Sequence, residues 1–157
     1  MKVLAENRGK VYCAIAIDRP SDVVSPFPGI VFPCMIWDHE GGFGEVQRTE
    51  VAKRLLEANC RYVVCGGLNS EEWHNVVDME FVRQHLNDPV DTLDAVHVMT
   101  TGHEGESPDD VAFFFVLNTN FDEHNFERYL VLHVGDGKQK GEVDAAVRRY
   151  ALGKEAV

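Results

Sequence analysis

The chain has 157 residues, and 45% of them are hydrophobic, a composition that fits one folded domain and excludes a disordered chain. Its 26 acidic and 15 basic residues give a formal net charge of −11, which argues against nucleic acid or an anionic membrane surface as a partner. No stretch approaches the roughly 20 apolar residues of a membrane span, and the N-terminus lacks the apolar core of a signal peptide. We therefore expect a cytoplasmic protein in which residues 1–157 form a single domain.

The first part of the chain predicts three strands and a helix. Apolar residues at 11–17 predict the first strand, and the proline-containing segment 18–30 that follows predicts a surface loop. Residues 31–37 predict the second strand. Apolar side chains share one face over 45–59, which indicates a helix, and 61–67 predicts a third strand ending in two glycines.

The middle of the chain predicts a helix and a fourth strand. Asn69 is an expected N-cap, because Glu72 stands at the spacing of a capping box. The helix that follows runs through Phe81, and Asp78 marks a point where it could break. Residues 94–100 predict the fourth strand.

The sequence of the last third predicts a helix, a strand and a second helix, in that order. Ser107 is expected to cap a helix whose body is 111–118, although that apolar run also fits a strand. Residues 128–134 predict a fifth strand, almost wholly apolar and so buried on both faces. A final helix is expected from Glu142 to Leu152, with Gly153 as its stop.

Alternating strands and helices predict an α/β fold, a three-layer α/β/α sandwich with a mainly parallel sheet of about five strands. No helix is expected between the first two strands. The first strand is therefore expected to be an edge strand or antiparallel to the others.

Polar and glycine-rich segments follow the predicted strands, and ligands of an open parallel sheet bind beyond the carboxyl ends of its strands. The tripeptide His-Glu-Gly occurs at two of these places, at 39–41 and 103–105. We expect the loops to share one edge of the sheet and to form any functional site. The candidate binding residues are Asp38, His39, Gly41, Gly42, Gly66, Gly67, Thr101 and Glu104, and the candidate catalytic residues are Cys65, His103 and Glu40.

Three chemistries could use this edge. Cys65 could be a thiol nucleophile with His39 or His103 as its base, although its surroundings lack the residue pattern of a nucleophile elbow. Imidazoles and carboxylates of the same loops could bind a divalent metal, but their spacing is not that of a known metal motif, and we expect no metal and no cofactor. The glycines of 40–45 could hold a phosphate, which Glu45 would repel.

Other histidines and the cysteines are expected to be structural. His97 and His133 lie in apolar segments, which is typical of hydrogen-bonded interior histidines. Four cysteines without metal-ligand or disulfide-framework spacing indicate reduced, mostly buried thiols.

Two functions from different classes remain open. The first is a small acidic cytosolic binding protein whose partner is a protein or small molecule, in an inhibitor-like or immunity-like role; a homodimer is possible. The alternative is a small hydrolase-like or transferase-like enzyme with its site at the carboxyl edge of the sheet. A cavity that joins Glu40, Cys65 and His103 would favour the enzyme.

Overall fold

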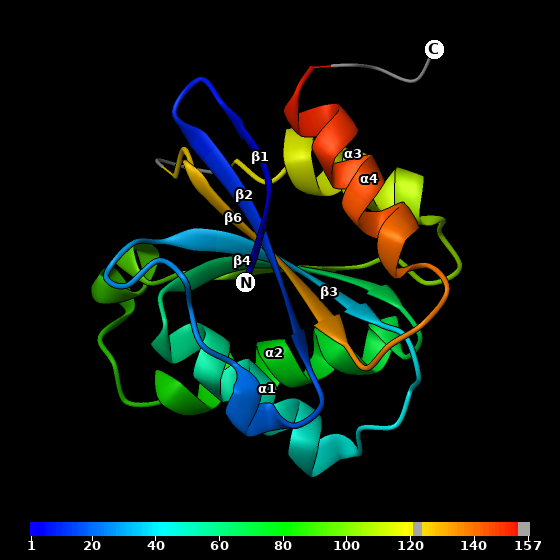
Figure 1. Cartoon of the computed structure of the whole chain (residues 1–157). Helices are drawn as coiled ribbons and strands as arrows, with labels where there is room; N and C mark the ends of the chain where they lie inside the picture. The colour runs from blue at the N-terminus through cyan, green and yellow to red at the C-terminus, as the bar shows by residue number, and fades with distance from the viewer. Residues whose placement is uncertain (121–123, 154–157) are drawn as a thin grey trace.

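A computed structural model describes residues 1–120 and 124–153. The strands are Lys2–Asn7 (β1), Lys10–Ile17 (β2), Phe32–Asp38 (β3), Cys60–Gly67 (β4), Met99–Gly102 (β5) and Arg128–Val134 (β6). They form one sheet in the order β1-β2-β6-β3-β4-β5 (Figure 1). The edge strand β1 is antiparallel to β2, and every other neighbouring pair is parallel.

Helices cover both faces of this sheet, as the sequence predicts for a three-layer α/β/α sandwich (Figure 1). Glu45–Glu57 (α1) and Ser70–Gln84 (α2) pack on one face, and Pro108–Leu117 (α3) and Lys140–Ala151 (α4) pack on the other. Short 3-10 helices lie at Pro20–Asp22 and Val90–Ala95. Within the part of the chain that the structure describes, no helix is long and apolar enough to cross a membrane.

The central strands are buried on both faces, and their alternation divides the core in two. Cys34 and Ile36 of β3 face α1 and α2, whereas Met35 and Trp37 face α3 and α4. The same alternation in β6 sends His133 to the α3 and α4 side, because its register partner in β3 is Trp37. Burial on both faces explains why these strands are nearly continuous apolar runs in the sequence.

Several predicted boundaries were wrong at the two ends of the sheet. The strand β1 was not predicted, because its sequence holds charged residues, and the predicted first strand at 11–17 is β2. The antiparallel edge is therefore β1, while β2 is parallel to β6. The predicted strand at 94–100 begins only at Met99, and His97 lies before it in a partly exposed segment, not inside a strand.

The helix predictions were more accurate than the capping predictions. Ser107 caps α3 as predicted, with its Oγ accepting a hydrogen bond from the Asp110 N–H at 3.1 Å, and residues 111–117 are helical. Asn69 occupies the N-cap position of α2, but its left-handed backbone (φ 57°) leaves the side chain without a capping bond. The helix α2 continues through Asp78 without a break.

The chain departs in opposite directions from the two strands at the centre of the sheet. After β3 it enters α1 on one face, and after β6 it enters α4 on the other face (Figure 1). Since β3 and β6 are neighbours, their carboxyl ends form a topological switch point. Ligands of open α/β sheets bind in the crevice at such a point.

Candidate functional site

A chain of hydrogen bonds joins two histidines and an aspartate at this switch point. The Nε2 of His39, just beyond β3, lies 2.8 Å from the Nδ1 of His133 in β6. The Nε2 of His133 lies 2.7 Å from the Oδ1 of Asp144 in α4. His133 is 1% exposed and Asp144 is 8% exposed, whereas His39 is only partly buried. We call these three residues the relay.

Local structure holds His39 in place. Its backbone N–H donates to the carbonyl of Val134 at 3.0 Å, which extends the β3–β6 pairing by one step beyond the strand. Its ring lies at 26° to that of His133, with the ring centroids 5.0 Å apart. Gly137 lies against the same ring, since a Cβ added there would be 3.0 Å from Nδ1. The glycine lets the loop after β6 approach the imidazole closely.

When both imidazoles are neutral, the hydrogen bonds of the relay assign one tautomer to each ring. With Asp144 as a carboxylate, His133 donates through Nε2–H and its Nδ1 accepts. His39 then donates through its own Nε2–H, which leaves a lone pair on its Nδ1. That atom has no hydrogen-bond partner among the described residues. Burial, followed by the nearby His133, lowers the pKa of His39 below its ordinary value of 6.5, which favours the neutral ring at pH 7.

A cavity of about 400 Å³ opens beside His39 on the α3 side of the sheet. Its polar side chains come from the loops after β3, β4 and β5 and from the start of α4. The lining residues are Trp37, Asp38, His39, Gly67, Leu68, Asn69, Glu104, Gly105, Glu106 and Gln139. The indole Nε1 of Trp37 is buried without a hydrogen-bond partner among the described residues.

Asp38 and Glu40 build the loops around the relay. Asp38 is 1% exposed, and its carboxylate accepts from the Gly41 N–H at 2.8 Å and from the Trp73 Nε1 at 2.9 Å. Glu40 accepts from the Asp136 N–H at 3.0 Å and so ties the loop after β3 to the loop after β6. Both carboxylates thus position loops, and Glu40 does not meet His103 or Cys65.

The second His-Glu-Gly segment is arranged differently from the first. Both ring nitrogens of His103 are used, since Nδ1 lies 2.9 Å from a carboxylate oxygen of Glu106 and Nε2 lies 2.8 Å from Oγ1 of Thr101. The ring is 7% exposed and packs on Phe114 at 4.7 Å. His103 therefore has no free nitrogen, and Thr101 is engaged with it.

The structure does not support the prediction that Cys65 is a thiol nucleophile. Cys65 is fully buried, in the core beneath α1 and α2, whereas His103 lies on the opposite side of the sheet against α3. Burial raises the pKa of the Cys65 thiol far above its ordinary value, which disfavours the thiolate. Only its backbone carbonyl meets His103, by accepting from the His103 N–H at 2.9 Å. Glu40, Cys65 and His103 thus do not converge.

The glycines of this edge serve packing and turns. A Cβ on Gly66 would lie 2.7 Å from the Trp37 ring, and one on Gly67 would lie 2.5 Å from the carbonyl oxygen of Asp38. Gly42 lines a smaller cavity of about 210 Å³ on the α1 side.

The other two predicted chemistries find little support at this edge. The amides of Gly41 and Gly44 donate to Asp38 and Gln47, so they are not free to hold a phosphate. No three His, Cys, Asp or Glu side chains of the described residues gather as metal ligands would.

The relay itself was only half visible in the sequence. His39 was a candidate because it follows a strand. His133 was predicted to be a hydrogen-bonded interior histidine, which its burial and its two hydrogen bonds confirm, but its link to His39 was not predicted and Asp144 was not considered. The signal available was a histidine at the end of an apolar strand and an aspartate in the first turns of the next helix. Such a pair is common, and only the three-dimensional register of β3 with β6 brings His39 to it.

The comparisons with known proteins address the family and not the activity. A family model described as a domain of unknown function, DUF7684, matches residues 12–150. The chain belongs to this family. The DUF7684 match contains every residue of the relay and leaves out β1. No curated protein and no solved structure matches the chain.

Proposed function

We propose that this protein is a small hydrolase-like enzyme in which His39 is the general base. The observation that carries the proposal is the relay, because His39 lines a cavity and its Nδ1 has no hydrogen-bond partner among the described residues. A buried carboxylate behind a histidine holds the ring in one tautomer and stabilises the cation that forms when the ring takes a proton. Here a second imidazole stands between the carboxylate and the base.

The cavity also supports water as the nucleophile. Among the described residues that line it, none is Ser, Thr, Cys or Lys, so no hydroxyl, thiol or amine side chain there can act as the nucleophile. His39 Nδ1 would take a proton from a water molecule as that water attacks an acyl carbon. The proton then passes to the leaving group as the bond to it breaks. General-base assistance of this kind contributes about 10²- to 10⁴-fold in rate.

The lining favours neutral or cationic substrates. Glu104 and Glu106 are charged side chains that line the cavity, and no Lys or Arg lines it among the described residues. We place the enzyme in the cytosol, since its cysteines are free and buried.

Hydrolysis of p-nitrophenyl acetate at pH 7.5 tests the proposal without knowledge of the natural substrate. The wild-type protein should turn over repeatedly, and His39→Gln should lower the protein-dependent rate by about 10²-fold. His85→Gln is the matched control, because His85 pairs with Asp88 at the far end of α2 and lies outside the relay. A wild-type rate no greater than that of His39→Gln would contradict the proposal.

A second proposal is the acidic binding protein, and exposed apolar side chains on α1 and α2 favour it. Val46 is 84% exposed and Met79 is 69% exposed, and Met79 lines a shallow groove together with Glu45 and the paired Glu80 and Arg83. A basic protein with an apolar contact would suit such a surface. Val46→Asp and Met79→Asp should then weaken binding of that partner without changing the esterase rate, whereas His39→Gln should leave binding intact.

A further inference from the structure

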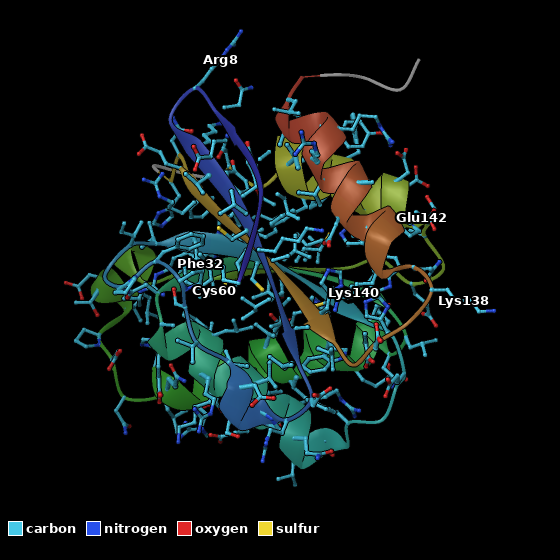
Figure 2. The ribbon with its side chains drawn as sticks, viewed as in Figure 1. Arg8, Phe32, Cys60, Lys138, Lys140 and Glu142 are labelled. Atoms are coloured by element: carbon cyan, nitrogen blue, oxygen red, sulfur yellow. The ribbon has the colours of Figure 1, made fainter. Side chains whose placement is uncertain are left out.

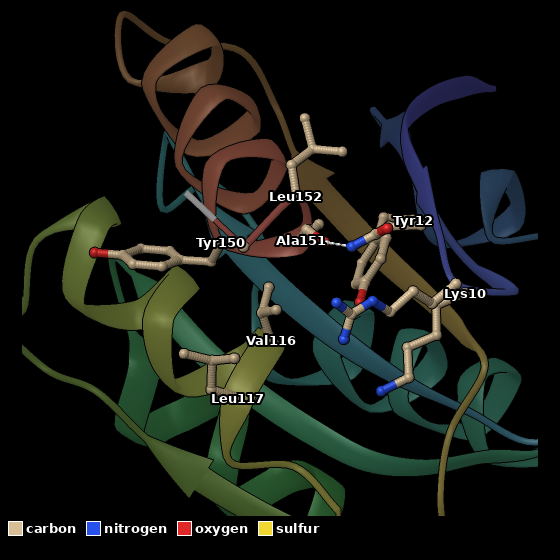
Figure 3. Close-up of a pocket in the computed structure, with 10 residues that line it drawn as sticks. Lys10, Tyr12, Val116, Leu117, Tyr150, Ala151 and Leu152 are labelled. Carbon is tan, nitrogen blue, oxygen red and sulfur yellow. Dashed lines mark hydrogen bonds between the residues drawn. The ribbon is translucent and has the colours of Figure 1, made fainter. Parts of the chain in front are cut away.

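A second cavity lies at the amino edge of the sheet, opposite the relay. It has a volume of about 420 Å³ and lies between the β1–β2 turn and the C-terminal ends of α3 and α4 (Figure 3). One wall is polar and the other is apolar. The polar wall consists of Asn7, Arg8, Lys10 and Tyr12, and the apolar wall includes Val116, Leu117, Ala151 and Leu152.

The cavity is built by contacts that hold its walls together. The Nδ2 of Asn7 donates to the carbonyl of Ala151 at 3.0 Å, which joins the end of β1 to the end of α4 (Figure 3). Arg148 of α4 donates through Nη1 to the carbonyl of Leu4 in β1 at 3.0 Å. Two hydrogen bonds between distant parts of the sequence thus fix the opening between the β1–β2 turn and α4.

Tyr12 places an unused hydroxyl at this cavity. The residue is 3% exposed and stacks on Tyr129, with ring centroids 4.6 Å apart. Its hydroxyl makes no hydrogen bond with any described residue, although the side chain lines the cavity. Burial raises the pKa of Tyr12 to about 12, so the hydroxyl keeps its proton and remains a donor at neutral pH.

Two cations accompany this donor, and neither has a carboxylate partner among the described residues. Lys10 is half-buried, with its Nζ 5.9 Å from the centroid of the Tyr129 ring. Arg8 occupies the turn with a left-handed backbone (φ 52°), and Figure 2 shows it at the tip of the β1–β2 hairpin. No Asp or Glu is among the residues that line the cavity. In a chain with a net charge of −11, an opening with only basic charges is unusual.

We propose that this amino-edge cavity binds a small organic anion, a carboxylate or phosphate attached to a short apolar body. Lys10 and Tyr12 would hold the acidic group, with Arg8 closing over it from the turn, and charge-assisted bonds of this kind are the stronger class of hydrogen bond. Val116, Leu117 and Leu152 would contact the apolar body. The site is separate from the relay and does not depend on the proposed hydrolase activity.

Titration of the ¹⁵N-labelled full chain with benzoate and with phenyl phosphate tests the site by NMR. Both anions should shift the amide signals of Asn7, Leu152 and Gly153, and benzyl alcohol, which has the same ring without the charge, should bind at least tenfold more weakly. The anion that binds more tightly would show whether the cavity prefers a carboxylate or a phosphate. Equal binding of benzyl alcohol would overturn the proposal.

Two substitutions assign the binding to the named side chains. Lys10→Gln and Tyr12→Phe should each weaken anion binding by about tenfold while the remaining amide signals keep their positions, which shows that the fold is intact. Lys138→Gln is the matched control, since Lys138 lies near the start of α4 at the other edge (Figure 2). Unchanged affinity in both variants, or a loss as large in Lys138→Gln, would also overturn the proposal.

Discussion

The two His-Glu-Gly segments share a sequence and a place after a parallel strand, but their histidines meet different surroundings. His39 donates to a second histidine that rests on a buried carboxylate, and one of its nitrogens is left free. His103 is more deeply buried, and both of its nitrogens are engaged by its own loop and strand. In the proposed enzyme the first imidazole takes the proton, whereas the second holds the loop before α3 together.

The difference comes from the strand that lies beside each loop. His39 follows β3, whose neighbour β6 carries the chain to the other face of the sheet and brings His133 with it. His103 follows β5, which is the edge strand of the sheet that the described residues form. At the switch point, His39 therefore bonds to a residue from a distant part of the chain. At the edge of the sheet, the His103 ring bonds only to residues close to it in sequence.

Removal of the Asp144 carboxylate should have the largest effect, because it acts on the His39 loop and not on the His103 loop. Asp144→Asn keeps the shape of the side chain but removes the charge that stabilises protonated histidine, and its amide can reverse the tautomer of His133. We expect the rate of p-nitrophenyl acetate hydrolysis to fall by about 10²-fold and the apparent pKa of the rate to decrease. A pH–rate profile measures both. An unchanged profile would show that Asp144 does not act on His39.

Substitution of His103 should affect stability and not rate. His103→Ala removes hydrogen bonds to Glu106 and Thr101 and the packing on Phe114, which we expect to cost about 2 kcal/mol in the free energy of unfolding. Urea denaturation measures this cost, and the esterase rate per folded molecule should match the wild type. If the rate fell as far as in His39→Gln, the contrast between the loops would be lost.

The glycines of the two tripeptides give a matched pair with a smaller effect. Gly41 and Gly105 both have left-handed backbones, with φ of 66° and 74°, so alanine is strained at either position. A Cβ on Gly41 would also lie 3.3 Å from Asn69 and 3.4 Å from Leu68, whereas a Cβ on Gly105 would meet nothing within 4 Å. We expect Gly105→Ala to lower the free energy of unfolding by about 1 kcal/mol and Gly41→Ala to lower it by about 2 kcal/mol. Urea denaturation measures both values. The reverse order would mean that the 103–105 loop is the more tightly packed.

The smallest expected effect is the pH dependence of stability. Because the pKa of His39 is lowered by folding, the unfolded chain takes up this proton at a higher pH than the folded chain. The stability that the neutral ring contributes is complete above about 6.5 and is lost as the pH falls through the lowered pKa of the folded state. Wild type should therefore lose more stability than His39→Gln between pH 7 and pH 5. Parallel curves would contradict the lowered pKa.

The sequence predicted the layers of the fold better than its edges. Continuous apolar runs such as 128–134 and 61–67 identify buried strands, and the cap at Ser107 identifies a helix, because these signals are local. The strand β1 escaped prediction, since an antiparallel edge strand needs no apolar run on its outer side. The short strand β5 gives a weak signal for a similar reason.

The sequence predicted where His39 lies but not which residues it bonds to. The rule that loops after parallel strands share an edge placed His39 beside the cavity. The same rule made Cys65 look accessible, although the alternation of β4 turns its thiol into the core between the sheet and α1 and α2. The partnership of His39, His133 and Asp144 depends on the strand order, in which β6 inserts between β2 and β3, and no local pattern encodes that order.

The most direct test of the relay is a ¹H–¹⁵N imidazole spectrum of the histidines at pH 7.5. Long-range couplings report which ring nitrogen carries the proton. We predict that His39 is neutral, with a proton on Nε2 and none on Nδ1, and that His133 also carries its proton on Nε2. A His39 ring that is protonated on Nδ1 or positively charged at this pH would contradict the account, because the lone pair that it assigns to the base would not exist.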